Sequence, residues 1–279
     1  MSKPVIVITI LIVLFTAACG STGGEISETL DFSYPDTDPA PVDLILGDGV
    51  LNINSGEAAG VTGSIMTNVS EWAPQFSEGE MLEIRQNSIT RDVIRDGTNT
   101  WNVNLGTEQA IALNVSNGNA AVNFNLDGIQ LASLSAEGSS GSYNLTSETP
   151  SPLIGVSASF TLTTGSMQLT NLLNSGMSLI ETETTGGDQI LIFDGETLRE
   201  DVRVEASAGS GDITLRIDQD IPVQVIFRTT AGVVQQTDNQ LFMDMGNRVY
   251  ESESFADSEG SRLIVEILTV TGDLRLVGI

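Results

Sequence analysis

The segment LNVSNGNAAVNFNL, residues 113–126, carries the pattern that decides the fold. Val122, Phe124 and Leu126 alternate with asparagines, and they follow a turn-forming stretch around Gly118. Alternating apolar and polar residues are typical of a strand with one buried face, and Gly and Asn favour turns. The segment is therefore predicted to form a strand, a glycine turn and a second strand.

The same arrangement recurs in segments that each place a glycine turn between two apolar, alternating stretches: 134–145, 160–169, 180–193, 204–217, 225–234 and 265–276. The turn glycines of the series lie 20 to 27 residues apart: Gly118, Gly138, Gly165, Gly187, Gly209 and Gly232. One supersecondary unit per period of this length is the signature of a solenoid. We therefore expect residues 44–279 to form an all-β solenoid without α-helices, with about 20–27 residues per coil.

A solenoid predicts how the units pack against one another. One unit has too few inward side chains to offset its chain entropy, so units must stack and share one apolar column. Leu215 alternates with Ile213 and Ile217 and is expected to point inward. Val122 should lie near the unit 134–145 and Ile213 near the unit 180–193, strand parallel to equivalent strand. The alternative is an antiparallel β-sandwich, in which the strands flanking one glycine pair across the turn.

With its glycine turns at Gly106, Gly118, Gly128 and Gly138, the run from Trp101 to Gly138 resembles the bacterial toast-rack, or adhesin-like, β-solenoid domains. These domains share sequence features with the C-terminal part of the LiaF-type cell-envelope stress proteins. The closing units around Gly209 and Thr271 are similar. The resemblance implies a right-handed, single-stranded solenoid at the bacterial surface or envelope, and it supplies no catalytic residues.

Composition excludes several functions. The chain contains no histidine, and its Asp and Glu total 37 against 11 Lys and Arg, a net charge of −26. This charge repels nucleic acid phosphates, so no nucleic-acid partner is expected. Without histidine, and with Cys19 as the only cysteine, Ser-His-Asp and Cys-His catalytic systems and the usual zinc sites are excluded.

The N-terminus has the features of an export signal. Lys3 precedes an apolar run, Val5 to Ala18, which is too short to span a bilayer. The run ends in Thr-Ala-Ala before Cys19, which resembles a lipoprotein signal with Thr16 at the position where Leu is usual. We expect residues 1–18 to be a signal peptide and Cys19 to be lipidated, which would attach the protein to a membrane.

Residues 19–43 are rich in Gly, Pro, Ser, Thr and acids, and they are predicted to form a flexible tether. The alternative is that residues 30–34 add an edge strand to the folded domain. Towards the other end of the chain, residues 235–261 interrupt the repeat and are expected to be an excursion or a cap.

Acidic residues offer the only candidates for site chemistry. Glu181 and Glu183 lie at alternate positions of one predicted strand, and Asp218 and Asp220 have the same spacing. Such pairs could perform general acid/base chemistry, although solvent-exposed coil surface is the simpler interpretation. Two further acids are calcium candidates because they follow glycines in turns: Asp188 and Asp212. No organic cofactor is expected.

The aromatic residues Trp72, Phe76 and Trp101 could dock a ligand, but core or cap positions are favoured for them.

Together these features predict a non-catalytic, adhesin-like binding or scaffold module in the cell envelope, at the outer membrane or cell surface, with an unidentified protein or glycan partner. The alternatives are an envelope-stress sensor that acts through a membrane protein and, less favoured, a polysaccharide-acting enzyme.

Overall fold

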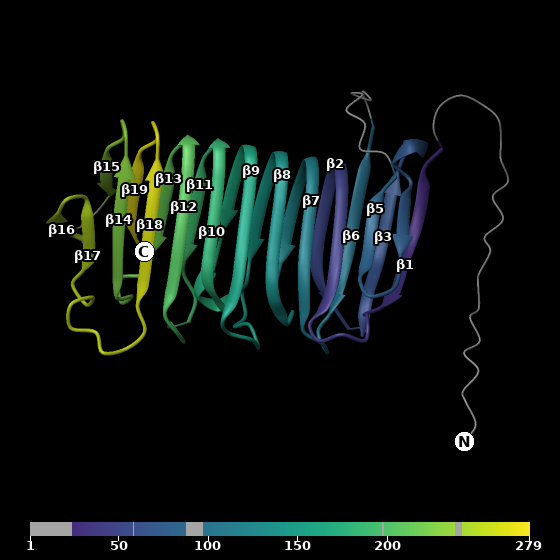
Figure 1. The fold of residues 1–279 in the computed structure, drawn as a ribbon, viewed down its shortest axis with the longest axis horizontal. Helices are drawn as coiled ribbons and strands as arrows, with labels where there is room; N and C mark the ends of the chain where they lie inside the picture. The colour runs from purple at the N-terminus through teal and green to yellow at the C-terminus, as the bar shows by residue number, and fades with distance from the viewer. Residues whose placement is uncertain (1–23, 58, 88–96, 197, 238–241) are drawn as a thin grey trace, which may run out of the picture.

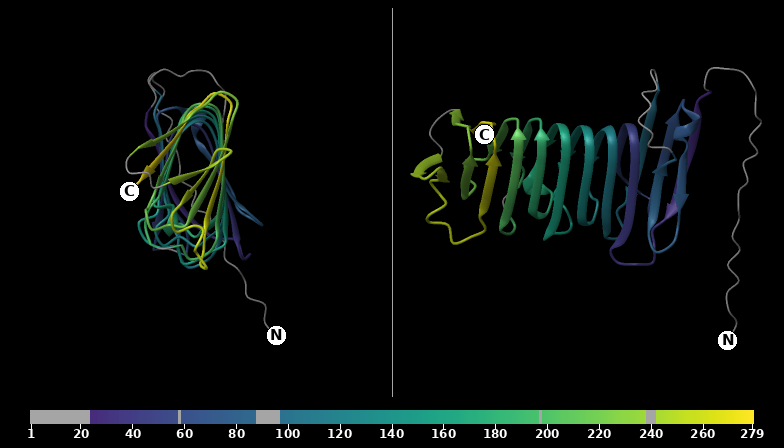
Figure 2. Two further views of the ribbon diagram at one scale, coloured as in Figure 1. Left: turned by 90° about the vertical axis from the view of Figure 1, so that its left-hand side faces the viewer. Right: turned by 45° about the horizontal axis from the view of Figure 1, so that its top comes forward.

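The computed structural model describes residues 24–57, 59–87, 97–196, 198–237 and 242–279. The predicted signal peptide 1–18 and Cys19 lie outside these ranges. Within these ranges the chain forms nineteen strands joined into one sheet, which winds into a long, flattened column (Figures 1 and 2). In the described ranges there is no α-helix, and no helix is long and apolar enough to cross a membrane.

Four long strands form the central coils: β2 (Ala40–Gly56), β7 (Ile111–Asn125), β8 (Leu131–Thr146) and β9 (Val156–Leu169). Each strand bends at its glycine turn and continues onto the opposite face of the column (Figure 1). β7 pairs in parallel with β2 and with β8, and β8 pairs in parallel with β9. Val122 pairs with Tyr143, so the predicted parallel stacking of coil on coil is confirmed.

The C-terminal coils place separate strands on the two faces. In spatial order they are β10 (Met177–Gly186) with β11 (Gln189–Phe193), β12 (Val202–Ser210) with β13 (Ile213–Ile217), β18 (Leu263–Thr269) with β19 (Leu274–Gly278), and β14 (Val223–Thr229) with β15 (Val234–Thr237). All neighbouring pairs are parallel, and Ile213 pairs with Gln189 as predicted.

The order of these coils differs from the order in the chain. The coil β18–β19 lies between β12–β13 and β14–β15, because β18 pairs with both β12 and β14. The regular spacing of Gly209 and Gly232 therefore does not mean that their coils are adjacent. That part of the predicted series is wrong: the turn at Gly272 stacks on Gly211, and Gly232 in turn stacks on Gly272.

At the N-terminal end, antiparallel strands cover the column. On one face β6 (Asn99–Gly106) pairs in parallel with β2 and antiparallel with β3 (Gly60–Thr67), which pairs with β1 (Ile26–Ser33). On the other face β5 (Leu82–Gln86) pairs in parallel with β2 and antiparallel with β4 (Pro74–Ser77). A 3-10 turn, η1 (Ser70–Trp72), precedes β4.

The predicted tether is therefore wrong over residues 26–43. Leu30, Phe32 and Tyr34 fall in or directly after β1, and Leu30 is 1% exposed. Burial of Leu30 and Tyr34 stabilises this end of the fold, where β1 pairs with β3, and this agrees with the alternative prediction of an edge strand. The folded part begins near residue 26 rather than at residue 44.

At the C-terminal end, β16 (Phe242–Gly246) and β17 (Val249–Ser252) form an antiparallel hairpin, and β17 also pairs with β14. Residues 235–261 were expected to be an excursion or a cap. The structure places their strands as a cap over the last coil (Figure 1).

Alternating side chains fill the interior of the column. Ile213, Leu215 and Ile217 are buried, so the predicted inward register is confirmed. In the central coils the rings of Phe124, Tyr143 and Phe160 pack at centroid distances of 6.1 to 6.5 Å. No ladder is formed across a glycine turn within one unit, which excludes the β-sandwich for the described coils.

The glycine turns stack into a ladder along one edge of the column. Gly141, Gly165, Gly187 and Gly211 have φ angles of +120° to +142°, a region that L-residues with a side chain rarely adopt. A Cβ atom on Gly187 would lie 1.6 Å from the carbonyl oxygen of Gly165. Each turn therefore needs glycine because the backbone of the neighbouring coil occupies the space of a side chain.

Candidate binding surface

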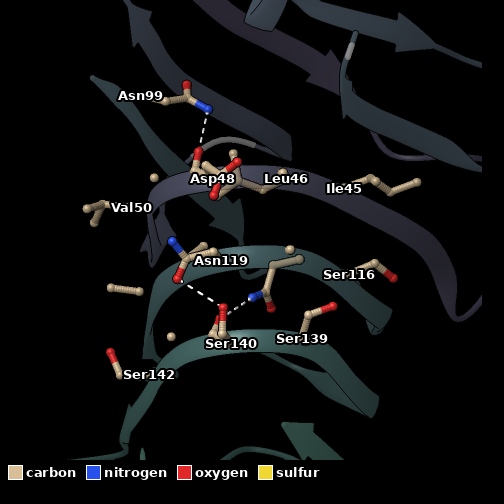
Figure 3. Close-up of a pocket in the computed structure, with 18 of the residues that line it drawn as sticks. Ile45, Leu46, Asp48, Val50, Asn99, Ser116, Asn119, Ser139, Ser140 and Ser142 are labelled. Carbon is tan, nitrogen blue, oxygen red and sulfur yellow. Dashed lines mark hydrogen bonds between the residues drawn. The ribbon is translucent and has the colours of Figure 1, made fainter. Parts of the chain in front are cut away.

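A shallow groove follows the glycine-turn edge of the central coils (Figure 3). Its volume is about 1540 Å³, and it crosses the turns of β2, β7, β8 and β9. Small residues and main chain dominate its lining, together with hydroxyl and amide side chains such as Ser116, Asn119 and Ser140. The groove is open because the stacked glycines carry no side chains along this edge.

Buried amides support the groove from below. The Gln86 side chain accepts hydrogen bonds from the Gly47 N–H at 2.9 Å and from Asn99 Nδ2 at 3.0 Å. The Tyr143 hydroxyl donates to Asn117 Oδ1 at 2.6 Å. Burial raises the pKa of Tyr143 well above its ordinary value, and the charge of Glu137 acts in the same direction. These groups hold the turns in place, and Asn99 and Asn117 also line the groove.

Beside the groove, on the face formed by the second halves of the long strands, outward side chains form an uncharged polar area that we call the amide surface. Its first row follows paired positions across β3, β6, β2, β7, β8 and β9: Ser64, Asn102, Asn52, Asn123, Asn144 and Gln168. Its second row lies two residues along on the first five of these strands: Thr62, Asn104, Asn54, Asn125 and Thr146.

Three hydrogen bonds join the asparagines of the first row. Asn144 Nδ2 donates to Asn123 Oδ1 at 3.1 Å, and Asn123 Nδ2 donates to Asn52 Oδ1 at 2.8 Å. Asn52 Nδ2 donates to Asn102 Oδ1 at 2.9 Å. The four amides therefore point the same way, and their dipoles strengthen one another along the column axis.

Sequence reasoning missed the amide surface, although a local signal exists. The tripeptides Asn52-Ile-Asn54, Asn102-Val-Asn104 and Asn123-Phe-Asn125 repeat the pattern of two asparagines around one apolar residue. Two asparagines on one face of each strand must form rows once the strands stack in register.

On the opposite face of the column, the outward side chains of the C-terminal coils are charged. Glu181, Glu205 and Glu266 occupy paired positions on β10, β12 and β18. Arg203 lies 2.8 Å from Glu205 and 3.0 Å from Glu266, and Arg228 lies 3.7 Å from Glu266. The cations offset part of the repulsion between the stacked carboxylates.

The acidic pairs take different positions. Glu181 and Glu183 do share the outward face of β10, and both are exposed beside a depression of about 400 Å³ that Glu205, Glu266 and Arg228 also line. Asp218 and Asp220 do not lie on a strand face: they follow β13 in a turn, where the Asp218 carboxylate accepts the N–H of Asp220 at 3.0 Å. The two pairs lie on separate parts of the fold.

The calcium candidates belong to a second ladder beside the glycines. Asp188 accepts the backbone N–H of Asp212 at 2.9 Å, and Asp212 accepts that of Asp273 at 2.9 Å. Asp273 continues the series by accepting the N–H of Val233 at 3.0 Å. Each carboxylate thus satisfies a turn amide of the next coil. Within the described ranges no three acidic, cysteine or histidine side chains converge on a possible metal position.

The aromatic candidates are mostly interior. Trp101 is fully buried and Trp72 is 5% exposed at the N-terminal cap, where it also borders the groove. Phe76 is 39% exposed and packs against Phe32 at a centroid distance of 5.0 Å. Core and cap positions are therefore confirmed for the two tryptophans, and the amide surface itself carries no aromatic side chain.

Residues 21–149 match the family described as the N-terminal domain of toast_rack. Among proteins with curated functions, none matches the chain in sequence. A solved structure of a candidate cell adhesion protein from Clostridium sporogenes is 18% identical, with a TM-score of 0.47 over 92% of this chain and 100% of that one. A candidate adhesin from Bacteroides fragilis is 10% identical, with a TM-score of 0.38 over 92% and 97%. A candidate lipid-binding protein from Parabacteroides distasonis is 13% identical, with a TM-score of 0.37 over 91% and 97%.

Proposed function

We propose that this chain, whose residues 21–149 match the N-terminal domain of toast_rack, is a non-catalytic binding module of the bacterial envelope that holds an extended partner along its central coils. The observation that carries the proposal is the uncharged polar amide surface across β2, β7, β8 and β9, which lies beside the groove. Parallel stacking repeats the same hydrogen-bonding groups at intervals of about 4.8 Å. A long, repeating surface suits a long, repeating partner.

The exposed polar chemistry supports binding rather than catalysis. Catalysis by carboxylates needs two groups that converge on one reacting atom in a site that excludes water. Glu181 and Glu183 instead are exposed to solvent at the side of a shallow depression, and Asp218 is engaged with the backbone of its own turn.

The proposal includes membrane attachment through Cys19. The sequence around this residue supports it, and β1 begins only seven residues later, which would hold the N-terminal cap close to the bilayer. Replacement Cys19→Ser should release the protein from the membrane fraction and abolish incorporation of labelled palmitate. Unchanged palmitate labelling of the Cys19→Ser chain would contradict the anchor, while the binding surface could still be tested in that variant.

Site-specific crosslinking in cells tests the binding function. A photoreactive amino acid is placed at Asn123, in the middle of the amide surface, and separately at Thr214 on β13. Both positions lie in the same outward row, since Asn123 is linked through Asn144, Gln168 and Ile190 to Thr214. We expect a light-dependent adduct from position 123 and none from position 214. Equal adducts at both positions, or none at either, would contradict a partner on the central coils.

A further inference from the structure

The amide surface has unused hydrogen-bonding capacity. A primary amide offers two N–H donors and two acceptor lone pairs. The ladder uses one donor and one acceptor of Asn52 and of Asn123. Each of these amides therefore keeps one donor and one acceptor towards solvent, held in fixed orientation by its neighbours. Such preorganised groups lose little conformational entropy when they bind a ligand.

A shallow depression of about 550 Å³ lies over these rows. It is lined by side chains from both rows, including Asn54, Asn102 and Asn144, and by Gln168 at its far end. The depression ends where the row passes from Gln168 to the apolar Ile190 on β11. The surface is thus a bounded strip, and it crosses the strands in the direction of the column axis.

The charge around the strip limits the chemical class of ligand that it can bind. The sequence has no Lys or Arg between Arg95 and Arg199, and the whole chain carries −26. Anionic polymers would be repelled by this field, and the strip has no carboxylate row to attract cations. Hydroxyl groups, which donate and accept at once, match amides that present one donor and one acceptor each.

We infer that the amide surface binds an extended, uncharged polysaccharide laid along the solenoid axis. One sugar ring advances such a chain by a distance comparable with one strand spacing, so successive sugars meet successive coils in equivalent positions. The absence of an aromatic platform from the two rows makes each contact weak, and the affinity grows with the number of coils occupied. The inference rests on the proposed binding function and names the ligand class for the same surface.

Affinity electrophoresis of the full-length protein tests this inference. Gels contain one of three neutral polymers, hydroxyethylcellulose, dextran or galactomannan, or the anionic carboxymethylcellulose. We expect at least one neutral polymer to retard the protein and carboxymethylcellulose to leave its mobility unchanged. The double variant Asn52→Leu/Asn123→Leu should need at least a tenfold higher polymer concentration for the same retardation, because it removes the amides with little change of shape.

The control is Thr214→Leu, which makes an outward residue of the same row apolar beyond the strip. It should bind as the parent protein does. If the double variant unfolds, Asn123→Asp replaces it: this change keeps the side-chain shape, adds a negative charge and should also reduce retardation.

The possible failures are distinguishable. Failure of all three neutral polymers to retard the parent protein, together with a crosslinked protein adduct at position 123, would overturn the polysaccharide inference and leave the binding function intact. Retardation that persists in both amide variants would overturn the assignment to this surface. Retardation by carboxymethylcellulose alone would overturn the neutral ligand class.

Discussion

The central coils and the C-terminal coils have the same interior and different exteriors. Along one inward row, Phe160 in β9 and Ile267 in β18 are both buried, and glycines with positive φ stack in both regions. On the outside, asparagine and hydroxyl rows line one face of the central coils, whereas Glu and Arg side chains line the opposite face of the C-terminal coils. The interior and the turns determine the coil, so the outward positions are free to vary with function.

The two regions also differ in connectivity. Among the central coils, β7, β8 and β9 follow one another at 20 to 24 residues, as in the pairs Ile111 with Leu131 and Ser133 with Ser157, and only β2 is more distant, 71 positions before its partners in β7. The inserted coil pairs Val202 with Leu263, 61 positions apart. Because stacked coils are stabilised only by their neighbours, the two regions can be destabilised separately.

The largest expected effect comes from a charge in the shared inward row. Ile267→Asp should remove the stability of the C-terminal coils, because a buried, unpaired carboxylate costs about 4 kcal/mol or more. Hydrogen exchange should then show lost protection in β12 to β19 and retained protection in β7 and β8. Phe160→Asp should instead remove protection from the central coils. Uniform loss of protection in both variants would show that the column melts as one unit.

The next effect concerns the ladder of stacked glycine turns, which runs through both the central and the C-terminal coils. Gly187→Ala should destabilise the fold by about 3 kcal/mol, because its Cβ would meet the Gly165 carbonyl oxygen and its φ is +142°. The neighbouring Gly186→Ala is the control: its nearest atom would be Ser210 Oγ at 3.6 Å, so a change within about 1 kcal/mol is expected. Thermal unfolding measures both. Similar losses in the two variants would remove the steric explanation.

A smaller effect concerns the buried tyrosine of the central coils. Tyr143→Phe should cost about 1 to 2 kcal/mol, because Asn117 Oδ1 loses its donor in a buried position. The raised pKa of Tyr143 adds a dependence on pH. Above pH 10 the tyrosine of the unfolded chain loses its proton while the folded one keeps it, so stability falls as pH rises. Chemical denaturation from pH 8 to 11 should show a shallower fall in Tyr143→Phe, and an identical slope would contradict burial of the hydroxyl.

The smallest effect concerns the charged exterior. Arg203→Gln should destabilise the C-terminal coils by about 0.2 to 1 kcal/mol at low salt, because Glu205 and Glu266 lose an exposed cation. Glu181→Gln should have the opposite sign, since it removes one of three stacked carboxylates. High salt should shrink both effects. The strands β2, β7, β8 and β9 contain no such ion pair, so the stability of Asn123→Gln should not depend on salt. A salt response as large as that of Arg203→Gln would contradict the difference between the two regions.

The repeating part of the fold could be predicted from the sequence because its determinants are local. Alternation around Val122 and Ile213 fixes the inward face, and the glycine spacing fixes parallel stacking of coils. The caps could not be predicted in this way, because β1, β3 and β6 pair antiparallel over distances that no local period encodes. The inserted coil is a similar case: Gly232 has the spacing of the next coil, but Gly272 occupies that position.

The candidate surface was only partly accessible to sequence reasoning. The acidic residues Glu181 and Asp188 were visible as candidates because acids are chemically distinctive, yet Asp188 serves the backbone of the next coil. The asparagine rows become meaningful only when β6, β2, β7 and β8 are known to be adjacent. The identity of neighbours across 71 residues, as for Asn52 and Asn123, is a property of the tertiary structure.

The insertion of β18–β19 has a consequence for biogenesis. Ribosomes and export machinery deliver a chain from its N-terminus, so β12–β13 emerge before the strands that pair with their outer edge. During that interval the edges of β12 and β14 are open templates for any strand, including the equivalent strands of another copy. Exchange of β18–β19 between two copies would satisfy the same hydrogen bonds and produce a domain-swapped dimer. Crowded synthesis should therefore favour intermolecular assembly, and slow synthesis should favour the monomeric column.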